Sequence, residues 1–264
     1  MATPVNVFDG PEKLGRALAE RIADGIAASR SEGRRYVLGC PGGRTARTTY
    51  AALADVVRER GLSLDSLVIA MMDDYVEPTA GNNMRRIAPE LHFSCHRFAR
   101  TEILDPLNTA SPTSIPTDQL WLPDPIDPAA YDERLAAEGG IDLFLLASGA
   151  SDGHVAFNPP GSPVDTRTRV VTLAESTRRD NLHTFPEFRD VSEVPTHGVT
   201  VGIGTISDLA RELVMIVVGE HKRTAFARIT DATTYDPAWP ATVVHLGRTA
   251  SVVADAAAAA TAGG

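Results

Sequence analysis

Short runs of apolar residues, each ending in small or polar residues, recur along the chain and predict buried strands. Four runs have the length and composition of strands covered on both faces: 37–40, 67–72, 141–146 and 213–218. Between them, apolar residues recur at helical spacing, first at Leu14, Leu18, Ile22 and Ile26. This alternation predicts a parallel α/β architecture. The 264 residues, 43% of them hydrophobic, suffice for one domain, which we expect to span 1–264.

The segment after the third apolar run carries an acid and a histidine two positions apart, Asp152 and His154. Catalytic groups of open α/β sheets lie beyond the carboxyl ends of the strands, where this segment is expected. Asp152 is suited to hold the imidazole in one tautomer, as a general acid or base near neutral pH requires. A solvated loop with an inert histidine is the alternative. The position after a strand, together with a second motif upstream, favours catalysis.

The second motif is a glycine-rich turn after the first apolar run, with Gly42, Gly43, Arg44 and Thr45. A helix is predicted to follow, so backbone N–H groups and the positive end of the helix dipole point to a phosphate site. The turn matches neither the P-loop nor the dinucleotide pattern. A plain tight turn is the alternative, and Arg44 and Thr45 favour the anion site.

Two adjacent acids, Asp73 and Asp74, follow the second apolar run. Two adjacent carboxylates cannot point the same way, so we expect one to enter a cleft while the other caps or pairs. The alternative is that both are turn or N-cap residues. Because three strand ends carry polar residues suited to one small anion, we expect Asp73 and His154 to face one cleft together with the glycine-rich turn.

In combination, these motifs resemble the superfamily of glucosamine-6-phosphate deaminases and 6-phosphogluconolactonases, and more closely its deaminase branch. The resemblance extends from the first strand to about Val253. The matching segments are 38–43, 72–76, 152–158, 199–206 and 219–222. The resemblance implies a three-layer α/β/α fold around a mostly parallel, Rossmann-like sheet.

The resemblance also implies a role for each matching residue. Asp73 matches the acid that moves a proton between C1 and C2 of the opened sugar. His154, oriented by Asp152, matches the histidine that helps to open the pyranose ring. Phosphate-binding positions are matched by Gly42, Gly43, Thr45, Arg178 and Lys222. The implied substrate is a small-molecule sugar phosphate, and no cofactor is implied.

Pro159 departs from the deaminase pattern, which has a glutamate there. The stretch 159–161 is similar to the lactonase pattern, in which the histidine acts as general base on water. Arg44 occupies what is usually a glycine. Two reactions therefore remain open: deamination or isomerisation of a hexosamine or hexose 6-phosphate, and hydrolysis of a phosphorylated sugar lactone. A catalytically inactive sugar-phosphate sensor is a third alternative, but the retained acid–base residues favour an enzyme.

The composition and the net charge of the chain argue against several classes of partner. A net charge of −9 argues against nucleic acid, and the apolar runs are too short to span a bilayer. Cys40 and Cys95 give no disulfide framework, so free thiols and a cytoplasmic location are expected. His92 and His96 have helical metal-site spacing without a third ligand nearby, so no metal site is expected.

The segment 106–128 is rich in proline and is predicted to be a long surface connection, with a lid over the cleft as the alternative. A small homo-oligomer is compatible with the sequence. The identity of the sugar phosphate lies beyond what the sequence indicates.

Overall fold

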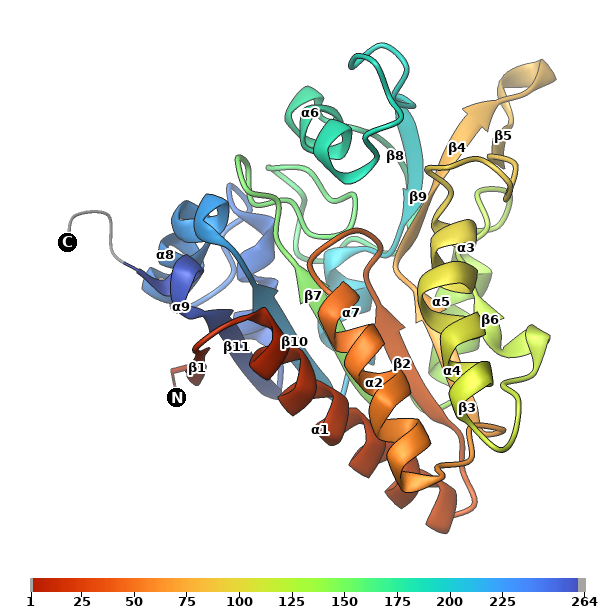
Figure 1. The fold of residues 1–264 in the computed structure, drawn as a ribbon. Helices are drawn as coiled ribbons and strands as arrows, with labels where there is room; N and C mark the ends of the chain where they lie inside the picture. Colours follow the sequence, from red (N-terminus) through yellow and green to blue (C-terminus); the bar gives the residue numbers. More distant parts are fainter. Residues whose placement is uncertain (1, 261–264) are drawn as a thin grey trace.

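The computed structural model describes residues 2–260, apart from the side chain of Asn82. Its main element is a seven-stranded sheet with the order β1-β11-β10-β7-β2-β3-β6, in which every pairing is parallel (Figure 1). The four predicted apolar runs form the adjacent strands β2, β3, β7 and β10. The strands are β1 (Val5–Phe8), β2 (Tyr36–Cys40), β3 (Leu67–Met71), β6 (Leu120–Trp121), β7 (Leu143–Ala147), β10 (Glu212–Val217) and β11 (Thr249–Asp255).

Helices cover both faces of this sheet, which confirms the three-layer α/β/α arrangement. Successive side chains of a strand point to opposite faces, so Leu38 of β2 enters one core and Val37 the other. Because both faces are buried, the strands read as continuous apolar runs. The first core includes residues of α1 (Pro11–Ser31), α2 (Arg47–Arg60), α3 (Cys95–Phe98) and α4 (Asp105–Ala110). The second includes residues of α5 (Ala129–Ala137), α7 (Ile203–Leu209), α8 (Arg223–Asp231) and α9 (Ala256–Ala259).

A second sheet of four antiparallel strands, which the sequence pattern does not predict, adjoins the first. Its order is β5-β4-β9-β8, with β4 (Asp73–Pro78), β5 (Met84–Arg86), β8 (Arg169–Thr172) and β9 (His197–Thr200). Only Met72 separates β3 from β4, so the chain passes directly from one sheet into the other. Asp73 and Asp74 lie in this strand, and the alternative interpretation of both as turn residues is therefore wrong.

Helix α6 (Glu175–Thr184) connects β8 to β9 and lies in the upper part of the molecule in Figure 1. A third, small hydrophobic core lies between the second sheet and the α6 region, with Tyr75, Phe157 and Phe188 among its buried members. Leu182 and Phe185 pack against it. This part of the chain therefore has its own core, separate from the two that flank the main sheet.

The proline-rich segment 106–128 is only in part the long surface connection that the sequence predicts. It contains all of α4 after Asp105, the short helical turn η3 (Thr117–Gln119) and the edge strand β6, where Trp121 is buried. No helix among residues 2–260 is both long and apolar enough to cross a membrane. The remaining short helical segments are η1 (Ala80–Asn82), the π-helical η2 (Ala99–Leu104), η4 (Glu220–Lys222) and η5 (Pro240–Leu246).

Candidate active site

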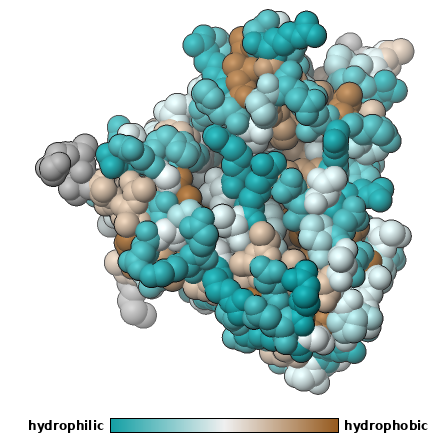
Figure 2. Space-filling model, in the orientation of Figure 1, coloured by the Kyte–Doolittle hydropathy of each residue, from teal (hydrophilic) through white to brown (hydrophobic). Residues whose placement is uncertain are grey.

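A cavity of about 430 Å³ lies where the carboxyl ends of β2, β7 and β10 face β4 and α6. Its volume is in the range of small-molecule sites. Figure 2 shows this face as mainly hydrophilic and hollowed below the part that carries α6. As expected, the three strand-end motifs converge here, and the lining includes Gly42, Gly43, Arg44, Thr45, Asp73, His154 and Lys222. No residue of 106–128 lines this cavity, so the lid interpretation of that segment is wrong.

One end of the cavity is cationic. The turn at 42–45 precedes α2, whose N-terminus provides the positive end of the helix dipole, and Gly43 has a φ of 84° that favours glycine. Arg44 is exposed to solvent and yet lines the cavity. Lys222 reaches in from η4 and donates to the carbonyl of Ser148. Backbone N–H groups and two cationic side chains together suit a phosphate group.

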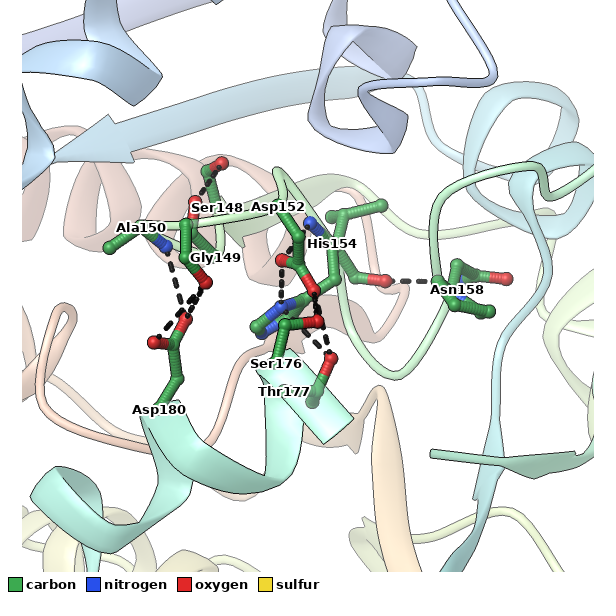
Figure 3. A network of polar contacts seen from close by, with 12 residues as sticks. Ser148, Gly149, Ala150, Asp152, His154, Asn158, Ser176, Thr177 and Asp180 are labelled. Carbon is green, nitrogen blue, oxygen red and sulfur yellow. Dashed lines mark hydrogen bonds and ion pairs between the residues drawn. The ribbon is translucent and has the colours of Figure 1, made fainter. Parts of the chain in front are cut away.

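The loop after β7 presents His154 to the cavity and Asp152 behind it (Figure 3). Nδ1 of His154 lies 2.7 Å from Oδ1 of Asp152, and the other carboxylate oxygen accepts from the hydroxyls of Ser176 and Thr177. Burial alone would raise the pKa of Asp152, but the hydrogen bond and charge of His154, with the Ser176 hydroxyl, lower it below its usual range. An ionised Asp152 fixes the tautomer with Nδ1–H, so Nε2 carries the lone pair.

Gly149 makes this arrangement possible. A Cβ at this position would lie 2.2 Å from Nδ1 of His154 and 2.5 Å from Oδ1 of Asp152. The backbone N–H of Gly149 also donates to the carbonyl of His154 at 2.7 Å, which closes the loop on itself. The loop therefore packs its own backbone against the Asp152–His154 pair.

Asp73 is the buried acid of the cavity, with 6% of its surface exposed. Its Oδ1 lies 3.4 Å from the thiol of Cys95, which also lines the cavity. Burial raises the pKa of Asp73 to about 7, against the lowering effect of the Cys95 hydrogen bond. A carboxyl group with this pKa can both accept and release a proton near neutral pH.

Asp74 points the other way, as alternation along a strand requires. Its Oδ1 accepts from the backbone N–H groups of Tyr75 at 2.9 Å and Cys95 at 3.0 Å. Burial raises its pKa to about 6, while these two hydrogen bonds lower it. The expectation that one acid enters the cleft while the other pairs is therefore correct, and Asp74 ties β4 to the start of α3.

Helix α6 forms one wall of the cavity, and sequence reasoning missed it. Its contribution to the lining consists of Asp180, Asn181, His183 and Thr184, followed by Phe185. A signal was present: Thr177, Asp180, Asn181 and Thr184 have the spacing of one helical face. A polar face on a helix ordinarily indicates solvent, which is why this one was not recognised. Tyr75, Cys95 and His221 are further lining residues without an assigned role.

Arg178 does not take part in the predicted anion site. Its guanidinium donates to the backbone carbonyls of Val191 and Val194, and Arg178 is absent from the cavity lining. The reason is helical geometry, because one step along α6 turns a side chain by about 100°. Thr177 faces the Asp152–His154 pair, so Arg178 faces the segment after the helix. The expectation that Arg178 and Lys222 converge on one anion is wrong for this structure.

Pro159 follows a well-anchored Asn158, whose amide nitrogen donates to the carbonyls of Val155 and Val201. Pro159 does not line the cavity, and the carboxylates among the lining residues are Asp73 and Asp180. Among the described residues, Asp152, His154 and Asp180 place one potential ligand atom each within 4.8 Å of one another. The site thus combines a cationic end that suits an anion, two groups suited to acid–base chemistry and a third carboxylate on α6.

Known proteins resemble this chain in sequence over nearly its whole length. The model of the family described as glucosamine-6-phosphate isomerases/6-phosphogluconolactonase matches residues 9–253. The glucosamine-6-phosphate deaminase of Streptomyces avermitilis is 38% identical over 249 residues, covering 92% of this chain and 88% of the relative. That of Rhodococcus opacus is 38% identical over 251 residues, covering 94% and 88%.

Solved structures agree with the fold. A monomeric glucosamine-6-phosphate deaminase superposes with a TM-score of 0.82 at 26% identity, covering 97% of this chain and 98% of the other. The 6-phosphogluconolactonase of Trypanosoma brucei has a TM-score of 0.69 at 22% identity, with 97% of each chain covered, which indicates a shared fold. The match over 9–253 and the sequence identities together establish that the chain belongs to the family of glucosamine-6-phosphate isomerases and 6-phosphogluconolactonases.

Proposed function

We propose that this protein is a sugar-phosphate enzyme of carbohydrate metabolism, a glucosamine-6-phosphate deaminase-like aldose–ketose isomerase. One observation carries the proposal: a single cavity combines a cationic end with two separate acid–base groups, Asp73 and the Asp152–His154 pair. The deaminase relatives at 38% identity support the same reaction. Hexosamine and hexose 6-phosphates are the substrate classes that use all three parts.

In the proposed mechanism, the phosphate binds at the turn 42–45 with Lys222 and Arg44. His154 uses Nε2 as a general base and acid, first to remove a proton from the anomeric hydroxyl and then to return it to the ring oxygen. Asp73 next moves a proton between C1 and C2 of the open chain, for which a pKa of about 7 is well placed. For an amino sugar this shift leaves an imine at C2, and water hydrolyses the imine to ammonia and the ketose 6-phosphate. Asp152 stabilises the imidazolium that forms on the way.

The second candidate is hydrolysis of a phosphorylated sugar lactone, and Pro159 is the observation that favours it. With Pro159 after Asn158, the loop of the Asp152–His154 pair provides no further carboxylate at this position. His154 alone would then activate a water molecule. Asp73 argues against lactone hydrolysis, because that reaction has no step that needs a buried acid with a raised pKa in addition to His154.

A small substrate panel tests the proposal: glucosamine 6-phosphate, galactosamine 6-phosphate, 6-phosphogluconolactone and ketohexose phosphates. Release of ammonia together with a ketose 6-phosphate is the expected result. Rapid lactone hydrolysis without ammonia release would replace the first candidate with the second. Binding of sugar phosphates without any turnover would identify a sensor.

His154→Ala is expected to lower turnover by roughly two to four orders of magnitude, the usual contribution of a general acid–base group. His197→Ala is a matched control, because His197 lies on β9 and does not line the cavity. A His154→Ala variant with normal turnover and weaker binding would assign this residue to recognition rather than catalysis.

We also infer a cytoplasmic enzyme that acts as a monomer or a small homo-oligomer. Cys40 and Cys95 are both free and buried, which suits a reducing compartment. The deaminase structure of similar fold is monomeric, which supports a small assembly. Sedimentation velocity of the purified protein would measure the assembly directly.

A further inference from the structure

Asp180 is a carboxylate of the cavity to which neither the mechanism above nor the family resemblance gives a task. It lies on α6 and faces the loop that carries Asp152 and His154 (Figure 3). The same cavity contains Lys222 and Arg44, which suit an anion. A negative charge beside these cationic side chains weakens the binding of an anion unless the ligand also has a positive or hydrogen-donating group.

The carboxylate of Asp180 has unused capacity to accept hydrogen bonds. Its Oδ2 accepts the N–H of Ala150 at 3.3 Å, and both oxygens lie 3.4 Å from the hydroxyl of Ser151. These contacts are long for a charged acceptor, whose hydrogen bonds to N–H donors ordinarily measure about 2.7–2.9 Å. The carboxylate of Asp152 differs from that of Asp180, because it accepts hydrogen bonds from His154, Ser176 and Thr177.

The carboxylate of Asp180 lies close to the imidazole of His154. A ring nitrogen of His154 and an oxygen of Asp180 lie within 4.8 Å of each other. Asp152 occupies Nδ1 of His154, so Nε2 is the nitrogen available to a ligand.

The chemistry of the two groups restricts which atom fits between them. A carboxylate accepts hydrogen bonds only, and neutral Nε2 is also an acceptor. A hydroxyl has one hydrogen and satisfies one of the two, whereas an amine or ammonium group has at least two hydrogens and satisfies both. A divalent cation is a poorer fit, because the carboxylate of Asp152 already accepts hydrogen bonds from His154, Ser176 and Thr177 and would have to give them up to bind a metal.

We propose that Asp180 is a specificity residue that binds the amino group of the open-chain substrate, together with His154 once its imidazole has returned the proton to the ring oxygen, and so selects amino sugar phosphates over their hydroxyl counterparts. The inference rests on the proposed function and names the substrate class of that same site. The positive amino group of such a substrate would sit at Asp180 while its phosphate sits at Lys222, so the carboxylate and the cationic end bind opposite charges of one zwitterion.

Binding of two unreactive ligands tests the proposal without relying on turnover. Glucitol 6-phosphate and 2-amino-2-deoxyglucitol 6-phosphate differ in one hydroxyl against one amine, and neither can close to a pyranose ring. By titration calorimetry we expect the wild-type protein to bind the amino ligand about 10- to 100-fold more tightly, the usual effect of one charge-assisted hydrogen bond. Asp180→Asn should reduce this preference to within about threefold, with the affinity for glucitol 6-phosphate nearly unchanged.

Asparagine keeps an oxygen that can accept from Ala150 and Ser151, so a role confined to anchoring the loop would survive this substitution. Glu175→Gln is the matched control, since Glu175 is an exposed acid of α6 that pairs with Arg179 and does not line the cavity. It should keep the full preference. Melting temperatures of both variants report on folding.

Three results would overturn the inference: an undiminished preference in Asp180→Asn, an equal loss of affinity for both ligands, or a preference that disappears on dialysis against EDTA. The last would assign the three groups to a divalent cation. Turnover of glucosamine 6-phosphate is measured on the same wild-type preparation. A protein that keeps the amine preference but does not turn over this substrate contradicts the proposed function and leaves the amine site standing.

Discussion

Asp73→Asn is expected to make the protein more stable above neutral pH while it abolishes most of the activity. The substitution keeps the shape of the side chain and removes only its ability to carry a negative charge. Asp73 is 6% exposed, and the thiol of Cys95 is its hydrogen-bond partner. An amide oxygen can accept from the same thiol, so the surroundings of residue 73 remain satisfied.

The size of the effect follows from the pKa of Asp73. Burial raises this pKa to about 7 from an ordinary value of 3.8. Between these two pH values the folded state binds more protons than the unfolded state, so stability falls as the pH rises and stays low above pH 7. The two pKa values differ by about 3, which at about 1.36 kcal/mol per unit gives an upper limit of about 4 kcal/mol. Relaxation of the neighbouring groups reduces this figure.

Urea unfolding of the wild type and the variant at pH 4 and pH 8 measures the prediction. Asp73→Asn should gain about 1–4 kcal/mol at pH 8 and close to nothing at pH 4, with turnover lowered by roughly two to four orders of magnitude. Asp231→Asn, at an exposed position on α8, is the control and should show no such pH dependence. Equal stability of Asp73→Asn and wild type at pH 8 would refute the argument from burial.

Substitutions at two further positions test the surroundings of the acid–base groups. Gly149→Ala should reduce turnover at least 100-fold, because the added methyl group would displace Nδ1 of His154. The circular dichroism spectrum should stay unchanged. Normal turnover would mean that the loop relaxes without cost. Cys95→Ala removes the hydrogen bond that lowers the pKa of Asp73, so the acidic limb of the kcat/KM profile should move to higher pH. Cys95→Ser, which restores a donor, should move it back, and an identical profile for all three proteins would exclude this contact from catalysis.

The main sheet could be predicted because its strands are buried on both faces and stand out as apolar runs. The second sheet could not. Its strands β5, β8 and β9 have three or four residues each, too few to show an alternating pattern. Strand β4 was not predicted for another reason. Met72 alone separates it from β3, so the sequence pattern shows β3 and the start of β4 as one apolar segment that ends in two acids.

The residues of the candidate site could also be predicted only in part. Residues on loops directly after main-sheet strands, such as Gly42 and His154, were found because topology fixes where such loops converge. The α6 wall was missed because a short polar helix gives no sign of what it faces. Arg178 was placed wrongly for a related reason: a motif gives the position of a residue along the chain, whereas its direction depends on the turn of the helix.

The attachment of α6 has a consequence for how substrate preference can change in this family. Ser176, Thr177 and Asp180 reach the 150–154 loop through side chains, and α6 belongs to a part of the chain with its own small core. Substitutions on the cavity face of α6 can therefore alter the ligand while the parallel sheet and its loops stay in place. A fold built in this way can exchange one sugar phosphate for another through a few positions of a single ten-residue helix.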